Sequence, residues 1–201
     1  MKKLILLQGA SSIGKSSWVR NHHLTDCTIS ADEIRQRLGL AVHTRRGNMP
    51  IIKIKNHDDS ITWDIFNKII DYRITQTDLT IVDNTNTSAI ALNQMHNLAA
   101  RYNCQVYLLD FMLQFDSANH KFDNVAVQRA QGTLLKRNSK RIMYPVPKYV
   151  IINQIGQYRA FRDDMDQHPD KYNWLKQLDV RSLNESDIAQ LIDNQQNKKG
   201  H

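Results

Sequence analysis

The segment at residues 9–16, GASSIGKS, constrains the fold of this chain more than any other feature. It has the spacing G-x-x-x-x-G-K-[ST] of a phosphate-binding loop. Its fixed positions are Gly9, Gly14, Lys15 and Ser16. An apolar run at residues 4–7 precedes it, and residues 17–20 can open a helix. A phosphate-binding loop lies between a buried strand and a helix N-terminus, so this context disfavours a chance match in a turn.

A loop of this kind binds phosphate because its backbone N–H groups converge on phosphate oxygens, and the first helical turn adds a partial positive charge. Lys15 is expected to reach the β- and γ-phosphates, and the Ser16 hydroxyl to join the coordination of Mg²⁺. The residues expected to contact the nucleotide are Gly9, Ser12, Ile13, Gly14, Lys15, Ser16 and Ser17. The motif therefore predicts a site for a nucleoside triphosphate with Mg²⁺.

The balance of charge suggests an anionic partner. The chain has 201 residues, enough for one domain with its own core, and a formal net charge of +7. Clustered cations attract phosphate groups, although a generally basic surface with no specific partner would give the same net charge. The cations gather in two stretches, Arg35, Arg37, Arg45, Arg46, Lys53 and Lys55, and Lys136, Arg137, Lys140 and Arg141.

The compartment can be predicted from what the sequence lacks. Cys27 and Cys104 lie far apart and have no metal-binding or redox spacing, so we expect two thiols in a reducing compartment. The first apolar run is too short for a signal peptide, and no stretch approaches the length of a membrane span. These features predict a cytoplasmic protein with no membrane partner.

Apolar strand patterns alternate with helical patterns along the chain, which predicts an α/β protein with the P-loop NTPase fold. Four strands are expected, at residues 4–8, 25–30, 79–83 and 104–111. Helices are expected near residues 16–23, 32–38, 88–102, 124–137, 147–161 and 185–193, and another is expected to start at residue 60. Residues 40–58 give no clear pattern, because Gly47 and Pro50 interrupt them.

The predicted architecture is a parallel sheet of four to five strands, with helices on both faces and a basic helical lid. Residues 1–201 are expected to form one domain, with the lid at about 124–148. The remainder, from about residue 160 to the end, is expected to be a helical tail.

Asp32 and Arg35 follow the second predicted strand, at the sheet edge where ligands of such folds gather. A carboxylate there can accept a hydroxyl proton during phosphoryl transfer, but Asp32 also fits a helix N-cap. Arg35 lies one turn further and can hold an acceptor phosphate, or it can be a solvated helix residue.

The third predicted strand ends in Asp83, followed by Thr85 and Asn86. An apolar strand that ends in aspartate is typical of a carboxylate that orients Mg²⁺, directly or through water. Thr85 and Asn86 would then face the same cleft with polar side chains. The alternative is an ordinary strand end with turn residues.

Arg137 and Arg141 lie four residues apart in the second basic stretch, so we expect them to share one face of a helix. Arginines in a mobile lid neutralise the charge that develops on a transferred phosphoryl group. A basic helix end that is favoured by the helix dipole is the alternative.

Taken together, these segments resemble the kinase domain of the phage polynucleotide 5′-kinase family, over roughly residues 1–160 and in the same order. The similarity rests on MKKLILLQG, GKSSWVR, ADEIR, VDNTN and LLKRNSKR, followed by Val146-Pro147. The most specific of these is the KRNSKR segment after ADEIR.

The resemblance implies transfer of the γ-phosphate of ATP to the 5′-hydroxyl end of RNA or DNA. It implies that Asp32 is the general base, that Arg35 holds the nearest acceptor phosphate, and that Arg141, supported by Arg137, acts on the ATP phosphates. Asp83, Thr85 and Asn86 would line the acceptor side. Two alternatives use the same loop and base: a kinase of a small hydroxylated metabolite, and a sugar-nucleotide kinase of the zeta-toxin type.

Overall fold

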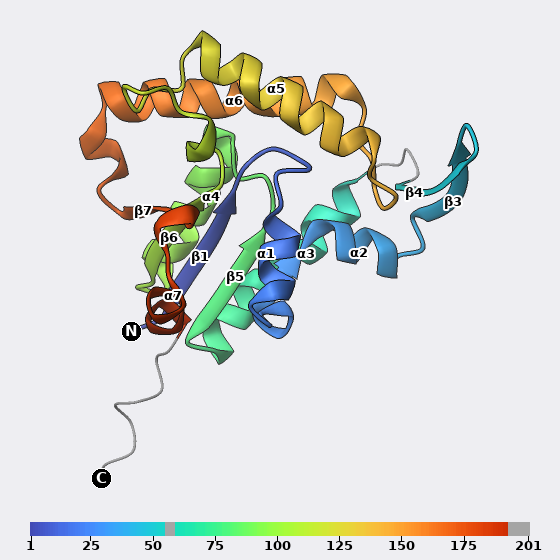
Figure 1. The fold of residues 1–201 in the computed structure, drawn as a ribbon. Helices are drawn as coiled ribbons and strands as arrows, with labels where there is room; N and C mark the ends of the chain where they lie inside the picture. The colour runs from blue at the N-terminus through green and yellow to red at the C-terminus, as the bar shows by residue number, and fades with distance from the viewer. Residues whose placement is uncertain (55–58, 193–201) are drawn as a thin grey trace.

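The computed structural model describes residues 1–54 and 59–192, and its centre is a five-stranded parallel sheet (Figure 1). The strand order is β2-β5-β1-β6-β7, and the four pairings along this order are parallel. The strands are β1 (Lys3–Gln8), β2 (Thr28–Ser30), β5 (Leu79–Asp83), β6 (Gln105–Asp110) and β7 (Leu175–Asp179). The α/β fold with a P-loop NTPase-like sheet, predicted from the sequence, is confirmed.

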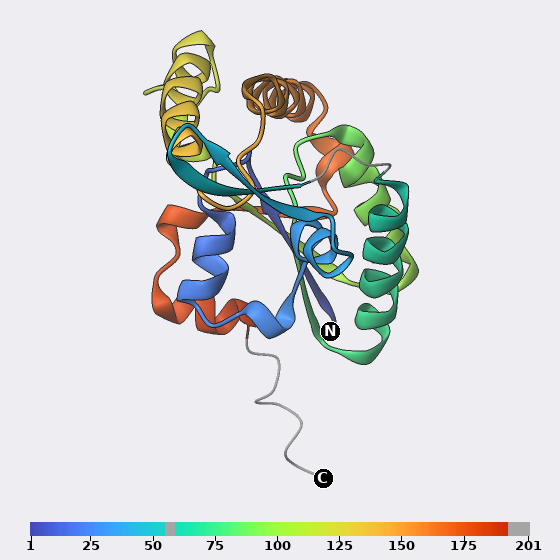
Figure 2. The ribbon, with the colours of Figure 1, turned by 90° about the vertical axis from the view of Figure 1, so that its right-hand side faces the viewer.

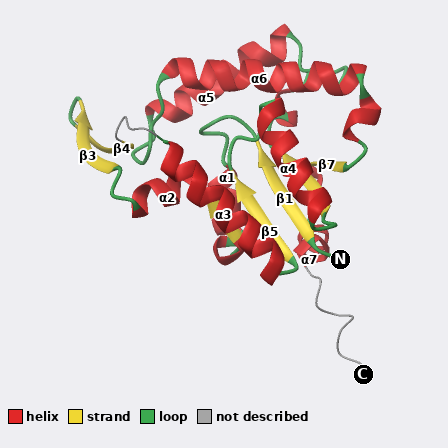
Figure 3. Ribbon diagram, turned by 180° about the vertical axis from the view of Figure 1, so that it is seen from behind, coloured by secondary structure: helices red, strands yellow, loops and turns green. Residues whose placement is uncertain are grey.

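Helices cover both faces of this sheet. In the side view, α1 and α7 lie on one face and α3 and α4 on the other (Figure 2). Seen from behind, α3 and α4 flank the strands β1 and β5 (Figure 3). Their bounds are α1 (Lys15–Asn21), α3 (Ser60–Gln76), α4 (Ala89–Arg101) and α7 (Glu185–Ile192), and the short α2 (Ala31–Arg37) packs against α3.

The core is built around β1, which lies between β5 and β6. Its residues 4–7, LILL, have no exposed surface, as expected for a central parallel strand covered on both faces. The phosphate-binding loop follows this strand directly. The loop therefore starts from a fully buried part of the molecule.

Two long helices, α5 (Asn124–Ser139) and α6 (Lys148–Gln167), lie side by side across the carboxyl ends of the strands (Figure 1). The side chain of Asp123 caps α5 by accepting a hydrogen bond from the Ala126 N–H. Pro147, expected in the first turn of α6, is its N-cap residue instead. This pair of helices forms the upper wall of the cleft described below.

The segment that the sequence left unassigned folds into an antiparallel hairpin, β3 (Ala41–Arg46) and β4 (Met49–Ile54). Gly47 has a φ of 59°, which is suited to its place in the tight turn. Pro50 pairs opposite Arg45 without ending the ladder. Lys55, which the sequence places in the same basic stretch, lies outside the described residues.

Two predictions about secondary structure were wrong. The C-terminal part is not all helical, because residues 175–179 add β7 to the edge of the main sheet. Its sequence, LKQLD, is short and half polar, so it has no strong strand pattern. The second strand is also shorter than predicted, since Thr25–Cys27 forms a 3₁₀ helix before it.

Three further 3₁₀ helices connect the larger elements, η2 (Leu113–Phe115), η3 (Pro169–Tyr172) and η4 (Val180–Ser182). The first lies between β6 and α5. Within residues 1–54 and 59–192, no helix is both long enough and apolar enough to cross a membrane.

Candidate active site

The phosphate-binding loop joins β1 to α1, and its glycines are required by geometry. Gly9 has a φ of 153°, and a Cβ atom there would lie 3.0 Å from Cγ2 of Ile13. Gly14, the N-cap of α1, has a φ of 118°. An L side chain rarely adopts these backbone conformations, so both glycines of the motif are needed for the shape of the loop.

Lys15 is folded back into its own loop. Its Nζ donates hydrogen bonds to the carbonyl oxygens of Gly9 at 2.7 Å and Ala10 at 3.4 Å, and the residue is only 8% exposed. Burial lowers the pKa of Lys15, while the charges of Asp83 and Asp32 act in the opposite direction. A triphosphate would supply the negative charge that this buried ammonium lacks.

Ser16 and Asp83 form the candidate metal site. The Ser16 hydroxyl donates to Oδ2 of Asp83 at 2.7 Å, which joins the start of α1 to the end of β5. In the described part of the chain, no group of three or more His, Cys, Asp or Glu side chains could hold a metal. One hydroxyl, one carboxylate and the nucleotide phosphates suit Mg²⁺, which keeps several waters and needs few protein ligands.

Thr85 and Asn86 border the cleft, as expected from the sequence, and both also make contacts that support the phosphate-binding loop. Asn86 is 2% exposed, and its amide donates to the carbonyl oxygen of Leu7 at 2.9 Å. The Thr85 carbonyl accepts from the Gly9 N–H at 2.9 Å. The amide of Asn86 turns into the protein and fixes the start of the phosphate-binding loop.

Asp32 lies in the first turn of α2 and its carboxylate is open to the cleft. The N-cap position belongs to Ser30, so the interpretation of Asp32 as the helix cap was wrong. Its side chain is 45% exposed, and Oδ1 accepts a hydrogen bond from Nη1 of Arg35 at 2.8 Å. The carboxylate is therefore both accessible and oriented by a fixed cation.

Arg35 is held between two carboxylates, and the alternative of a solvated helix residue was wrong. Its Nε donates to Oδ1 of Asp59 at 2.9 Å, its Nη2 pairs with Oδ2 of the same residue, and its guanidinium lies 5.3 Å from the ring centre of Trp63. The side chain is 15% exposed. Partial burial opposes the charge of Asp59, yet the pairing with Arg35 holds the pKa of that carboxyl below its usual value.

The prediction that Arg137 and Arg141 share one face of a helix was wrong. α5 ends at Ser139, so Arg141 lies in the following loop while Arg137 lies in the last helical turn. Nη1 of Arg137 donates to the Ile13 carbonyl in the phosphate-binding loop at 3.2 Å. The charge of Arg141 contributes to the lowered pKa of Lys15, so both arginines act on the same loop from different elements.

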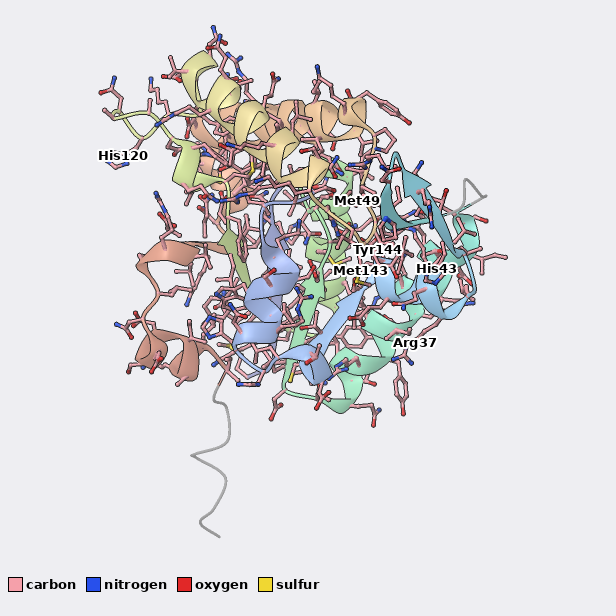
Figure 4. The ribbon with its side chains drawn as sticks, turned by 45° about the vertical axis from the view of Figure 1, so that its right-hand side comes forward. Arg37, His43, Met49, His120, Met143 and Tyr144 are labelled. Atoms are coloured by element: carbon pink, nitrogen blue, oxygen red, sulfur yellow. The ribbon has the colours of Figure 1, made fainter. Side chains whose placement is uncertain are left out.

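All these elements enclose one cleft of about 1360 Å³. A small-molecule site is usually about 300–1,000 Å³, so this cleft has room for more than one bound group. Figure 4 shows Met143 and Tyr144 beside the β3–β4 hairpin, at the rim of this cleft. Its described lining includes three carboxylates, Asp32, Glu33 and Asp83, and eight cations, Lys15, Arg20, Arg35, Arg46, Lys53, Arg137, Lys140 and Arg141.

Three residues of the site were missed from the sequence. Asp59 holds Arg35, Gln154 of α6 accepts a hydrogen bond from the Ser11 N–H at 2.8 Å, and Asn138 connects several segments of the cleft. Asn138 lies inside the KRNSKR segment, which was the available signal. Asp59 and Gln154 carry no local signal, because only the tertiary fold brings them to the site.

Comparison with known proteins agrees with this geometry at the level of the family. The sequence profile of the AAA domain family matches residues 4–163. The chain belongs to the AAA domain family. It is a P-loop, kinase-like domain, and residues 4–163 include every site residue described above.

No curated protein sequence matches the chain. Among solved structures, one chain from "Structure of Pnkp1/Rnl/Hen1 complex" is similar, with 18% sequence identity and a TM-score of 0.44. The match covers 68% of this chain and 38% of the other, so this chain spans well under half the length of that neighbour.

Proposed function

We propose that this protein is an ATP-dependent polynucleotide 5′-hydroxyl kinase. The observation that carries the proposal is a single cleft that contains a phosphate-binding loop, an exposed carboxylate at Asp32 and a large excess of cations. The cleft has room for a nucleotide and an acceptor together. The cations match an acceptor that is itself a polyanion.

On the donor side, the loop amides, Lys15 and the lid arginines would bind the phosphates of ATP. The Ser16 hydroxyl and the Asp83 carboxylate would hold Mg²⁺, which neutralises charge on the β- and γ-phosphates when bound. Lys15 would exchange its two carbonyl contacts for phosphate oxygens. Most of the catalysis would come from positioning and from compensation of charge.

On the acceptor side, Asp32 would take the proton of the 5′-hydroxyl as its oxygen attacks the γ-phosphorus. The bond from the γ-phosphorus to the bridging oxygen breaks, and ADP leaves. Arg35 orients Asp32 through the 2.8 Å hydrogen bond and would hold the nearest acceptor phosphate. Arg141 would stabilise the charge on the transferred group.

The test is the transfer of labelled γ-phosphate from ATP·Mg²⁺ to short 5′-hydroxyl oligonucleotides, with RNA and DNA in parallel. Wild type is expected to label the oligonucleotide, and Asp32→Ala to lose at least a hundredfold in rate. Asp64→Ala is the matched control, because Asp64 forms an exposed ion pair with Lys68 on α3, outside the cleft. Retained activity in Asp32→Ala would remove Asp32 as the base.

The salt dependence separates the acceptor classes. A polynucleotide acceptor predicts a KM that rises steeply with salt, because its binding releases counterions. A small neutral metabolite predicts almost no such dependence. Binding of ATP without label on any oligonucleotide would contradict the polynucleotide acceptor and favour a small hydroxylated one.

A further inference from the structure

The segment between α5 and α6, residues 140–146 and here called the lid loop, carries Arg141. It is closed at its base by one side chain. Nδ2 of Asn138 donates to the Val146 carbonyl at 2.8 Å, and the Val146 N–H donates to Oδ1 of Asn138 at 3.1 Å. Asn138 belongs to the last turn of α5, and Val146 directly precedes the N-cap of α6. These two hydrogen bonds therefore fix both ends of the lid loop to each other.

Asn138 also connects the lid loop to its surroundings. Its Oδ1 accepts from the Ser12 hydroxyl of the phosphate-binding loop at 3.4 Å. Its main-chain carbonyl accepts from the Arg141 N–H at 3.2 Å and from Nη1 of Arg46, on the hairpin, at 3.3 Å. The residue is only 7% exposed. A buried amide with its hydrogen bonds made has one orientation, so Asn138 sets the distance between these segments.

The tip of the lid loop is fixed by the hairpin. The Ile52 N–H donates to the Ile142 carbonyl at 2.8 Å, and the Tyr144 N–H donates to the Ile52 carbonyl at 2.7 Å. Tyr144 has a φ of 50°, which a bulky L residue adopts only under strain. Such a conformation persists where the surrounding contacts over-determine it. The lid loop is thus a strained segment that is held at its base and at its tip.

Arg141 lies between these two attachments. It borders the cleft, and its charge acts on Lys15. The hydrogen bonds described for the lid loop are made by its other residues, Ile142, Tyr144 and Val146. Of Arg141, only the main-chain N–H takes part. The position of the guanidinium in the cleft therefore depends on the attachments.

We propose that Asn138 is a positioning residue that holds Arg141 over the phosphate-binding loop through its hydrogen bonds with Val146 and Ser12. The proposal rests on the proposed function insofar as Arg141 contacts the γ-phosphate of ATP. Loss of the amide would release the base of the lid loop, allow Tyr144 to leave its strained conformation and withdraw Arg141 from the donor phosphates.

The first test is hydrogen exchange on the whole protein without ligand. Asn138→Ala is expected to raise exchange at least tenfold in a peptide covering residues 141–146, with little change in the central strands. Asn138→Asp keeps the acceptor oxygen but places a second carboxylate oxygen against the Val146 carbonyl, so a rise at least as large is expected. Asn93→Ala, on the exposed side of α4, is the matched control. Unchanged protection of residues 141–146 in both Asn138 variants would overturn the proposal.

The second test is a double-mutant cycle with Arg141→Ala, read as the ratio of ATP affinity to ADP affinity. Asn138→Ala is expected to lower this ratio about as much as Arg141→Ala, and the double variant to lower it no further. Effects that multiply would overturn the proposal, since they would show that Asn138 acts independently of Arg141. If Asn138→Ala does not fold, Asn138→Asp takes its place in the same cycle, with a loss of the ratio that Arg141→Ala does not increase further.

The affinity ratio needs no acceptor, so this test is separate from the proposed function. A wild type that prefers ATP to ADP but labels no oligonucleotide would contradict only the polynucleotide acceptor. A wild type that phosphorylates oligonucleotides, with variants whose effects multiply, would contradict only the role of Asn138.

Discussion

The phosphate-binding loop and the lid loop face each other across one cleft, but the chain holds them in different ways. The phosphate-binding loop follows β1, whose residues 4–7 are fully buried, and it is shaped by its own glycines and main chain. The lid loop lies at the surface and is held by side chains and by the edge of a hairpin. The donor side therefore takes its shape from local sequence and is supported by distant residues such as Asn86 and Gln154, whereas the opposite side depends on contacts between distant segments throughout.

This difference predicts how changes will act. Substitutions on the donor side should remove chemistry without changing the shape of the cleft, because the main chain sets that shape. Substitutions on the opposite side should change how substrates are placed, with smaller losses. The following predictions test this contrast, from the largest expected effect to the smallest.

Lys15→Ala is expected to lower phosphoryl transfer about a thousandfold or more, because it removes the buried cation that compensates phosphate charge. The melting temperature should not fall, since burial disfavours this charge in the free protein. Transfer of labelled phosphate and thermal unfolding measure the two effects. Lys121→Ala, at an exposed position, is the control, and a loss of less than about tenfold for Lys15→Ala would show that the loop acts through its main chain alone.

Asp83→Asn is expected to raise the Mg²⁺ concentration for half-maximal activity by about ten- to a hundredfold. The amide keeps the size of the carboxylate and an acceptor for the Ser16 hydroxyl, but it loses the negative charge. A titration of activity with Mg²⁺ checks this, with Asp64→Asn as the control. An unchanged Mg²⁺ dependence would assign Asp83 to the structural connection between α1 and β5.

Arg35→Ala is expected to raise the KM for an oligonucleotide acceptor about tenfold and to leave the KM for ATP nearly unchanged, because the described hydrogen bonds of the Arg35 side chain go to Asp32 and Asp59 and not to the loop. Steady-state kinetics with each substrate varied in turn measure this. Arg37→Ala, at the exposed end of the same helix, is the matched control. Equal loss for both substrates would contradict an acceptor role for Arg35.

The smallest effect on activity is expected at Asp110, the fully buried last residue of β6. Burial raises the pKa of Asp110 to about 6, although Tyr158, the Met112 N–H and Gln177 donate hydrogen bonds to it. Its pKa in the unfolded chain is about 4, so folding takes up a proton between about pH 4 and pH 6. The contribution of Asp110 to stability therefore falls as pH rises through this window.

Asp110→Asn removes this dependence. Relative to wild type, the variant should gain up to about 3 kcal/mol in free energy of unfolding between pH 4 and pH 7, whatever its constant loss of hydrogen bonds. Denaturant unfolding across this pH range measures the difference between the two proteins. A constant difference would show that Asp110 has the same pKa in the folded and unfolded states.

The sequence was most informative where local rules dominate. The bounds of β5 at Leu79–Asp83 were predicted correctly, because an apolar run between turn residues is a local signal. The helix expected near residues 88–102 is α4, and the side chain of Ser88 caps its start. The shared helical face of Arg137 and Arg141 was wrong, because α5 ends between them.

Other parts of the site depended on distant contacts. The hairpin at residues 41–54 gave no clear pattern, because most of its described residues are exposed and its contact with the lid loop comes from a distant part of the chain. The strand β7 was missed because it is a short, half-polar edge strand whose partner β6 comes from a distant part of the chain. Neither the hairpin nor β7 can be predicted from the pattern of its neighbouring residues alone.

By itself, the sequence determined the phosphate-binding loop, the parallel sheet and the family of folds, because glycine positions, apolar runs and turn residues act over a few neighbouring residues. Only the tertiary structure decided that Arg35 is held by Asp59, that Asn86 turns inward, and that Asn138 ties Arg141 to the loop. These contacts join residues that are far apart in the chain or that lie on either side of a helix end. Their geometry exists only once the sheet has brought its carboxyl ends together.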